Sequence, residues 1–203
     1  MKIDSDLNWK EQQNSVAIKL NKANAILSKL RHYVNQKTLR SIYFSLFESH
    51  TNYANIVWGQ NIDSSNRLFL LQKKAIRTMH FSQYLAHTDP LFYTANIVKI
   101  HDKVSVDNCM FISKSLCNYL PSLFKDWFIF SSSNHDHQLR SSNLGVLKIP
   151  KFRTLSHGRM SFRINAIYTW NNIQRVLKDH LLFALKPLKV KSILTKFYIN
   201  QYY

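Results

Sequence analysis

The sequence of 203 residues has few of the residues that form tight turns, with three glycines and four prolines. Hairpin-rich all-β folds and glycine-rich nucleotide loops need more of both, so this composition favours a mainly helical fold. No apolar run reaches the length of about 18 residues that a membrane span needs, and the first 13 residues lack the apolar centre of a signal peptide. We therefore expect a soluble intracellular protein, in the cytoplasm, the nucleus or both.

Cysteine is also scarce. Cys109 and Cys117 are the two cysteines, and they lie eight residues apart within a helical pattern. This spacing puts them on roughly one face of a helix but too far apart to pair, so we interpret both as reduced core residues. The spacing of a zinc knuckle is absent, as is the sequence of a nucleophile elbow.

Acidic residues are few as well, with 11 Asp and Glu against 28 Lys and Arg, which gives a formal net charge of +17. The basic residues are spread along the whole chain, while 45% hydrophobic residues are enough to build a core. Nucleic acid is the favoured partner for such a charge because neutralising its phosphates releases counterions. An acidic protein and an anionic membrane surface are the alternatives.

Apolar residues recur at steps of three and four along most of the chain, which is typical of amphipathic helices. The predicted helices span residues 14–34, 37–47, 63–79, 103–120 and 160–177, the first two packed as an antiparallel pair. Residues 50–58 either extend the second helix or form a short one, and Pro90 begins a further helical turn. Residues 145–150 fit a short strand.

The predicted helix over 63–79 combines an apolar stripe with a cationic flank. Its apolar stripe consists of Leu68, Leu71, Ala75 and Met79. Arg67, Lys74 and Arg77 fall near one flank, with Lys73 beside them. Such a helix can bury the stripe and present the cations to a ligand. An ordinary solvated face is the alternative interpretation.

Several short strings follow one another in order: KIDSDLNWK, NRLFLLQKKAIRTM, HTDPLF, NYLP, and PKFRT with Gly158, Ser161, Trp170 and Asn171. In order and spacing they resemble the end of the reverse transcriptase of non-LTR (LINE-type, jockey-like) retrotransposons, over nearly the whole chain. Two places depart from the family pattern, at residues 135–140 and at Gln174. A degenerate, non-functional remnant is therefore an alternative.

The resemblance implies a division of the chain. Residues 1–13 would be the residual end of the palm, 14–130 a helical thumb-like domain, 131–143 a polar linker, and 144–203 a smaller basic α or α+β region. Polymerisation needs paired aspartates that hold two metal ions. Asp4 and Asp6 belong to a string that follows those motifs, and we interpret His135 and His137 as solvated.

We therefore expect a non-catalytic fragment without cofactor or metal, whose exposed apolar faces would meet a missing palm domain or a second copy of the chain. The family's thumb lies along the template–primer duplex, so the expected partner is RNA, DNA or an RNA–DNA hybrid, contacted through phosphates. A protein-interaction module with a basic surface is the first alternative, and a membrane binder using the basic tail at 186–196 is the least favoured.

The candidate phosphate contacts are cations of the predicted helices and of the C-terminal region: Arg67, Lys73, Lys74, Arg77, Lys29, Arg31, Arg153 and Arg159. Tyr53 and Trp58 have the rings needed to stack on bases, but they stand within an apolar run. We interpret both as core residues.

Overall fold

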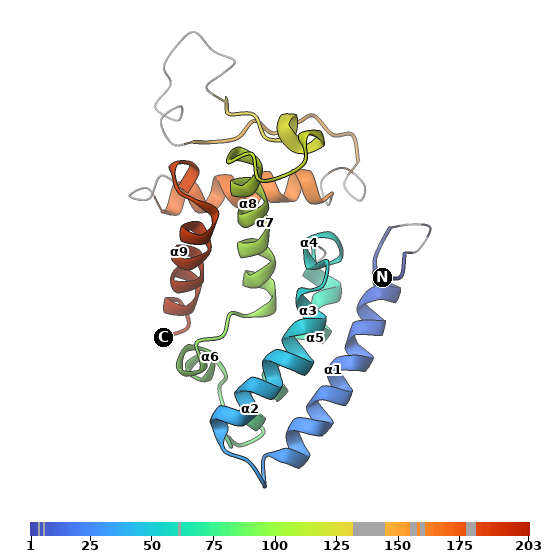
Figure 1. Ribbon diagram of the computed structural model, residues 1–203. Helices are drawn as coiled ribbons and strands as arrows, with labels where there is room; N and C mark the ends of the chain where they lie inside the picture. The colour runs from blue at the N-terminus through green and yellow to red at the C-terminus, as the bar shows by residue number, and fades with distance from the viewer. Residues whose placement is uncertain are drawn as a thin grey trace. The chain divides into compact units, whose positions relative to one another are not determined.

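The computed structural model describes residues 1–3, 5, 7–60, 62–131, 145–154, 158, 161–177 and 182–203, without the side chains of 62–65. These residues form a mainly helical fold, as predicted (Figure 1). The chain divides into two compact units. Unit 1 comprises Met1–Lys103 and Phe197–Tyr203, and unit 2 comprises Val104–Lys196.

Unit 1 begins with the two predicted helices. α1 spans Lys10–Leu30, and after a turn the chain continues in α2, Gln36–Ile42, whose N-terminus is capped by the Asn35 side chain accepting a hydrogen bond from the Thr38 N–H at 2.9 Å. A π-helical stretch, Tyr43–Glu48 (η1), extends α2, and it packs back against α1 as the expected antiparallel pair (Figure 1).

Residues 49–58 form two short helices, of which the first continues η1 without a break and so extends the second predicted helix. These are α3, Ser49–Asn52, and α4, Asn55–Trp58. Ala54 separates them with a left-handed backbone, φ 52°, which a continuous helix cannot contain. The remaining helices of unit 1 are α5, Ile62–Met79, and α6, Asp89–Ala95, followed by the start of α7, Ile100–Leu116. Pro90 lies in the first turn of α6, where its missing N–H costs nothing.

The core of unit 1 lies between α1 and α5. Val16, Leu20 and Leu27 of α1 and Leu68, Ala75 and Met79 of α5 are all buried, and Tyr43, Phe47 and Trp58 complete the core. Asn14 accepts a hydrogen bond from Arg67, and further along both helices Asn24 donates to the Leu71 carbonyl at 3.0 Å. The two helices therefore run parallel.

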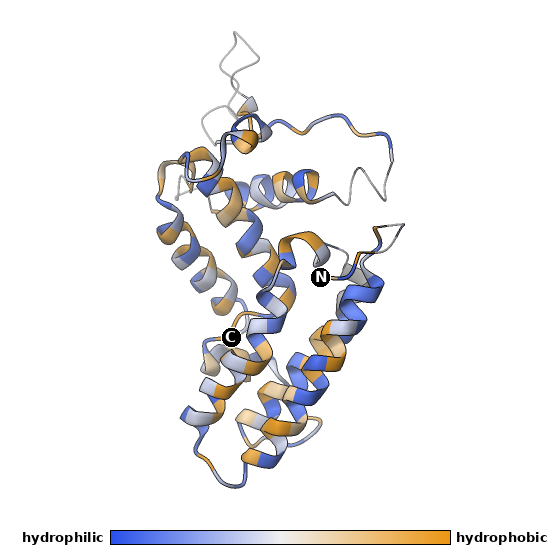
Figure 2. Cartoon of the chain, turned by 45° about the vertical axis from the view of Figure 1, so that its right-hand side comes forward, coloured by the Kyte–Doolittle hydropathy of each residue, from blue (hydrophilic) through white to orange (hydrophobic). Residues whose placement is uncertain are grey.

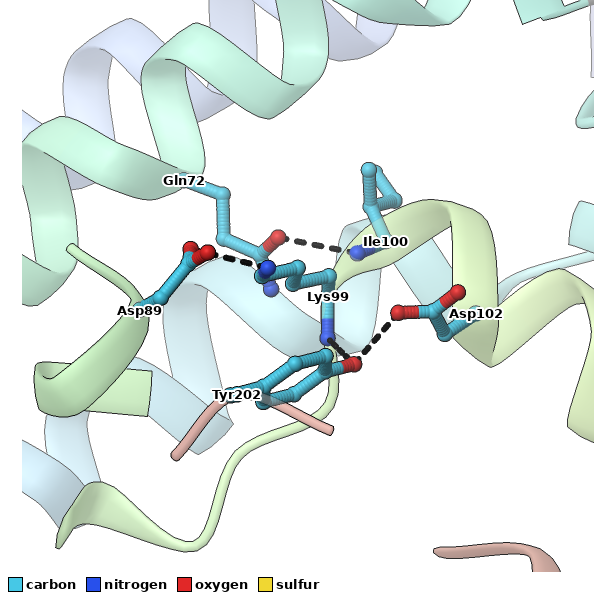
Figure 3. Close-up of polar contacts among 6 residues, drawn as sticks. All are labelled: Gln72, Asp89, Lys99, Ile100, Asp102 and Tyr202. Atoms are coloured by element: carbon cyan, nitrogen blue, oxygen red, sulfur yellow. Dashed lines mark hydrogen bonds and ion pairs between the residues drawn. The ribbon is translucent and has the colours of Figure 1, made fainter. Parts of the chain in front are cut away.

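A buried glutamine joins α5 to the start of α7 (Figure 3). The Gln72 amide donates to the Tyr43 hydroxyl at 3.0 Å and to the Val98 carbonyl at 3.1 Å, and its oxygen accepts from the Ile100 N–H at 2.9 Å. Gln72 belongs to one of the strings that carry the family resemblance. Its amide satisfies backbone groups that would otherwise be buried without partners.

The C-terminus returns to unit 1 through Tyr202 (Figure 3). Its hydroxyl donates to the Asp102 carboxylate and accepts from the Lys99 N–H at 3.1 Å. The Lys99 ammonium lies 4.2 Å from the Tyr202 ring centre and forms an ion pair with Asp89 at 2.8 Å. Burial raises the pKa of the Asp102 carboxyl, and the hydrogen bond from Tyr202 and the charge of Lys99 partly offset this effect.

This return adds the last residues of the chain to unit 1. The sequence suggested one helical domain over 14–130, but the division falls inside α7, and residues 197–203 belong to unit 1 because Tyr202 packs there. Local sequence patterns carry no information about such a contact between residues a hundred positions apart. The predicted linker, apart from Ser131, lies outside the described residues.

Unit 2 contains the rest of α7, a 3-10 helix at Ser122–Trp127 (η2), α8 at Phe162–Val176, a 3-10 turn at Leu182–Ala184 (η6) and most of α9, Pro187–Asn200. Cys109 of α7 is buried and Cys117 is half-buried, and both are free thiols. Phe111 packs edge-on against the rings of Phe124, Phe128 and Phe162.

The expected strand at 145–150 forms a single bridge, between Leu147 and Phe130, within the described residues. The Asn171 side chain hydrogen-bonds Leu147 as a neighbouring strand would. It accepts from the Leu147 N–H and donates to the Leu147 carbonyl, both at 2.8 Å. The neighbouring Trp170 indole donates to the Gly145 carbonyl at 3.0 Å. Residues 129–131 and side chains of α8 together satisfy this segment's backbone, through the Ser131 N–H to the Val146 carbonyl, the Lys148 N–H to the Ile129 carbonyl and the bonds of Trp170 and Asn171. No strand forms in the described part of this region, so its α+β alternative does not apply there.

Hydrophilic and hydrophobic residues alternate along the helices (Figure 2), as amphipathic helices require. Within the described part of the chain, no helix combines the length and the apolar character of a membrane span.

Asp102→Asn tests the buried carboxyl. Because the pKa of folded Asp102 lies above its ordinary value of 3.8, this group stabilises the fold below about pH 4 and loses that contribution as pH rises through the folded pKa. The Asn oxygen still accepts from Tyr202. We expect the free energy of unfolding of the wild type, relative to the variant, to fall between pH 4 and pH 7 in urea titrations. If the free energies of unfolding of the two proteins change with pH in the same way, the pKa of folded Asp102 is not raised.

Asn171→Asp should destabilise the protein, because a carboxylate cannot donate to the Leu147 carbonyl and would bring an unpaired charge into a buried site. We expect a loss of about 1–3 kcal/mol in free energy of unfolding, measured by denaturant titration. Asn172→Asp is the matched control, one residue along the same helix and exposed, and it should change stability by less than about 0.5 kcal/mol. Equal effects of the two substitutions would disprove the role given to Asn171.

Candidate nucleic-acid interface

A pocket of about 210 Å³ lies in unit 1 where α1 and α5 end. The C-terminal part of α1 and the residue after it contribute Ser28 and Arg31, α5 contributes Lys74, Arg77 and Thr78, and the loop after α5 contributes Ser82 and Tyr84. We call this site the basic pocket. The parallel packing of α1 and α5 creates it, because the two helices reach the same end of unit 1 together.

Arg31 is a half-buried cation of the basic pocket. Its guanidinium lies over the Phe81 ring, 5.4 Å from the ring centre, and its Nε is buried without a hydrogen-bond partner among the described residues. Phe81 follows the last turn of α5 with a left-handed backbone, φ 54°. The other N–H groups of the Arg31 guanidinium can donate to an acceptor that enters the pocket, such as a phosphate oxygen.

Arg77 and Lys74 have different surroundings. The Arg77 Nε donates to the Ala86 carbonyl at 2.9 Å, which ties the loop after α5 to the helix. The Ser82 N–H adds a bond to the Arg77 carbonyl at 3.0 Å. Lys74 is exposed, and its stem lies one turn before Thr78, whose hydroxyl donates to the Lys74 carbonyl at 3.0 Å. Arg77 therefore has a structural and an electrostatic role, whereas Lys74 contributes charge.

The basic pocket has no internal counterion. Its lining contains three cations and no carboxylate, and no ion pair within the described residues involves any of the three. Like charges brought together in a concavity repel one another and raise the local positive potential. An anion with several oxygens relieves this repulsion and can accept hydrogen bonds from the guanidinium groups.

The eight predicted phosphate contacts do not all lie at one place in the structure. Arg31, Lys74 and Arg77 line the basic pocket. Arg67 lies on the Lys74 side of α5, two turns earlier, and its guanidinium donates to Asn14 at 2.9 Å. Lys29 is exposed in the last turn of α1 but does not line the pocket.

Lys73 and Arg153 do not line the basic pocket either. The Lys73 ammonium lies 4.5 Å from the Phe69 ring centre, on a different side of α5 from Lys74. Arg153 is exposed in unit 2. Arg159 lies outside the described residues, as do Asp4, Asp6, His135 and His137.

The two aromatic candidates, Tyr53 and Trp58, differ in burial. Trp58 is buried, as predicted, and its indole donates to the Tyr53 carbonyl at 2.7 Å. Tyr53 is 64% exposed, so the prediction that it belongs to the core is wrong. The aromatic residue at the basic pocket is Tyr84, which the sequence analysis did not single out. Tyr84 lies in a loop, where no hydrophobic periodicity indicates which side chains face a site.

Unit 2 has a larger pocket of about 420 Å³, with mostly apolar walls that include Trp127, Ile149 and Pro150. Its cations are Lys148, Lys151 and Arg163. Arg163 already donates to the carbonyls of Trp127 at 3.1 Å and Asp126 at 3.4 Å. The basic pocket of unit 1 differs from it in containing Arg31, whose buried Nε has no hydrogen-bond partner among the described residues.

Among the described residues, no group of three or more His, Cys, Asp and Glu side chains is placed to hold a metal ion. Comparison with known proteins gives no match: no family model, no curated protein and no solved structure matches the chain.

An inorganic polyanion should stabilise the fold through the basic pocket. We expect saturating tripolyphosphate to raise the Tm, measured at constant ionic strength. The increase should be about 2–4 °C for each kcal/mol by which binding stabilises the folded state. Arg31→Gln combined with Lys74→Gln should lose most of that increase, while Arg77 stays to hold the loop. Lys19→Gln with Lys22→Gln removes the same charge from exposed positions of α1 and should keep it. Equal responses of the two double variants would show that no discrete site exists.

Proposed function

We propose that this chain is a non-catalytic nucleic-acid-binding protein that contacts the phosphates of RNA, DNA or an RNA–DNA hybrid with the cations around the basic pocket. The observation that carries the proposal is the convergence of Arg31, Lys74 and Arg77 on one concave site without a carboxylate in its lining. Two segments more than forty residues apart in the sequence supply these cations. Phosphate oxygens provide the charge and the acceptors that the site lacks.

The cations of α5 also have the spacing that a nucleic-acid backbone needs. Arg67, Lys74 and Arg77 lie on one helix, and the ten steps from residue 67 to residue 77 correspond to about 15 Å along its axis. A strand carries one phosphate per about 3.4 Å of a duplex axis, so the row can face several phosphates. Such contacts position a nucleic acid without reading its sequence.

We further propose that the chain derives from the thumb and downstream region of a non-LTR retrotransposon reverse transcriptase, and that it binds without polymerising. The support for this origin is the ordered set of strings along the sequence. Gln72, Trp170 and Asn171, which belong to those strings, each hydrogen-bond backbone groups of a distant segment. Such roles give a physical reason for retaining these residues.

The proposal predicts salt-dependent binding. The full chain should bind a short RNA–DNA hybrid with log K falling linearly with log salt concentration. The Arg31→Gln/Lys74→Gln variant should reduce the slope by about one to two, since each lost phosphate contact contributes roughly 0.7–0.9. Fluorescence anisotropy with a labelled hybrid at four or more salt concentrations measures both quantities.

The Lys19→Gln/Lys22→Gln variant is the control, because it has the same net charge and leaves the basic pocket intact. Its slope should stay close to that of the wild type. Equal slopes for both double variants would show that the charge of the whole chain, and not this site, binds. Absence of binding by the folded wild type would favour a protein partner or a non-functional remnant.

A further inference from the structure

Aromatic rings accompany the cations of the basic pocket. Tyr84 lines the pocket while 81% of its surface is exposed, and Phe81, beneath the Arg31 guanidinium, is 48% exposed. Leu85, next to Tyr84, is 87% exposed. Single exposed apolar side chains are ordinary, but here three large ones lie within five residues at the edge of a cationic site.

The structure holds Tyr84 in place from both sides of its loop. The Ser82 N–H donates to the Arg77 carbonyl, and the Arg77 Nε donates to the Ala86 carbonyl at 2.9 Å. The Ala86 N–H in turn donates to the Gln83 carbonyl at 3.1 Å. The loop backbone is thus closed onto the last turn of α5, which places Tyr84 in the pocket lining beside the cations. A loop backbone fixed in this way loses little conformational entropy when a ligand stacks on its side chain.

We infer that the basic pocket binds single-stranded nucleic acid, with a backbone phosphate among Arg31, Lys74 and Arg77 and the adjacent base stacked on Tyr84. This inference rests on the proposed phosphate-binding function and specifies its ligand. Single-strand binders combine a cationic groove with aromatic stacking platforms. In a duplex the faces of the bases cover one another, so a duplex leaves Tyr84 without a partner.

The size of the site agrees with this ligand. A pocket of about 210 Å³ is smaller than the usual range of about 300–1,000 Å³ for whole small molecules, so it suits one protruding group. A flexible single strand can turn a phosphate into the pocket and its base out toward Tyr84. A duplex backbone can face the row of Arg67, Lys74 and Arg77, but its stacked bases leave Tyr84 without a partner.

Three ligands of matched length test the inference on the full chain: an oligothymidylate, the same strand with abasic sites, and a duplex. Tyr84→Ala should weaken binding of the oligothymidylate by about 5- to 150-fold, the range for losing one stacked base. It should leave the salt slope unchanged, because tyrosine carries no charge, and it should not affect the abasic strand. Tyr84→Phe, which keeps the ring, should bind the oligothymidylate like the wild type.

Tyr53→Ala is the control, since Tyr53 is an exposed tyrosine of unit 1 that does not line the pocket. It should bind all three ligands like the wild type. If Tyr84→Ala binds the oligothymidylate as tightly as the wild type while the Arg31→Gln/Lys74→Gln variant is weakened, stacking is disproved and the phosphate site stands. If the wild type binds none of the three ligands, both proposals fail.

Discussion

The burial of the apolar stripe of α1 against that of α5 is the constraint on which unit 1 depends. It fixes the rotation of α5 about its own axis, because Leu68, Ala75 and Met79 must all face the core. This rotation places the cationic flank of α5 beside α1. Since the two helices run parallel, Arg31 at the end of one meets Lys74 and Arg77 near the end of the other. The basic pocket is a consequence of hydrophobic packing.

Buried amides complete this packing where the backbone leaves regular structure. Gln72 satisfies the segment that leads into α7, and Asn171 satisfies the extended segment around Leu147. Each makes hydrogen bonds as both donor and acceptor, which an apolar side chain of similar size cannot do. Because an unpaired buried N–H or C=O costs about 1–3 kcal/mol, these two side chains stabilise segments that have no helix or strand of their own.

The charge distribution opposes the stability of the fold. With a formal net charge of +17, any concentration of cations adds repulsion, yet three of them gather in the lining of one pocket without an acidic neighbour there. Elsewhere in unit 1 the structure does pair charge, as in the ion pair between Lys99 and Asp89. Departures from local stability rules are expected at functional sites, where a ligand supplies what the protein lacks.

The sequence by itself determined the mainly helical fold, the buried faces of α1 and α5, the break before α2 and the burial of Trp58, because these follow from local periodicity and capping. It also identified Arg31, Lys74 and Arg77 as candidates but not as neighbours. Only the tertiary structure decided that they share a pocket, that Lys73 lies on another side, that Tyr84 stands at the pocket edge and that Tyr202 returns to unit 1. Those facts depend on contacts between distant segments, which a pattern of period 3.6 does not encode.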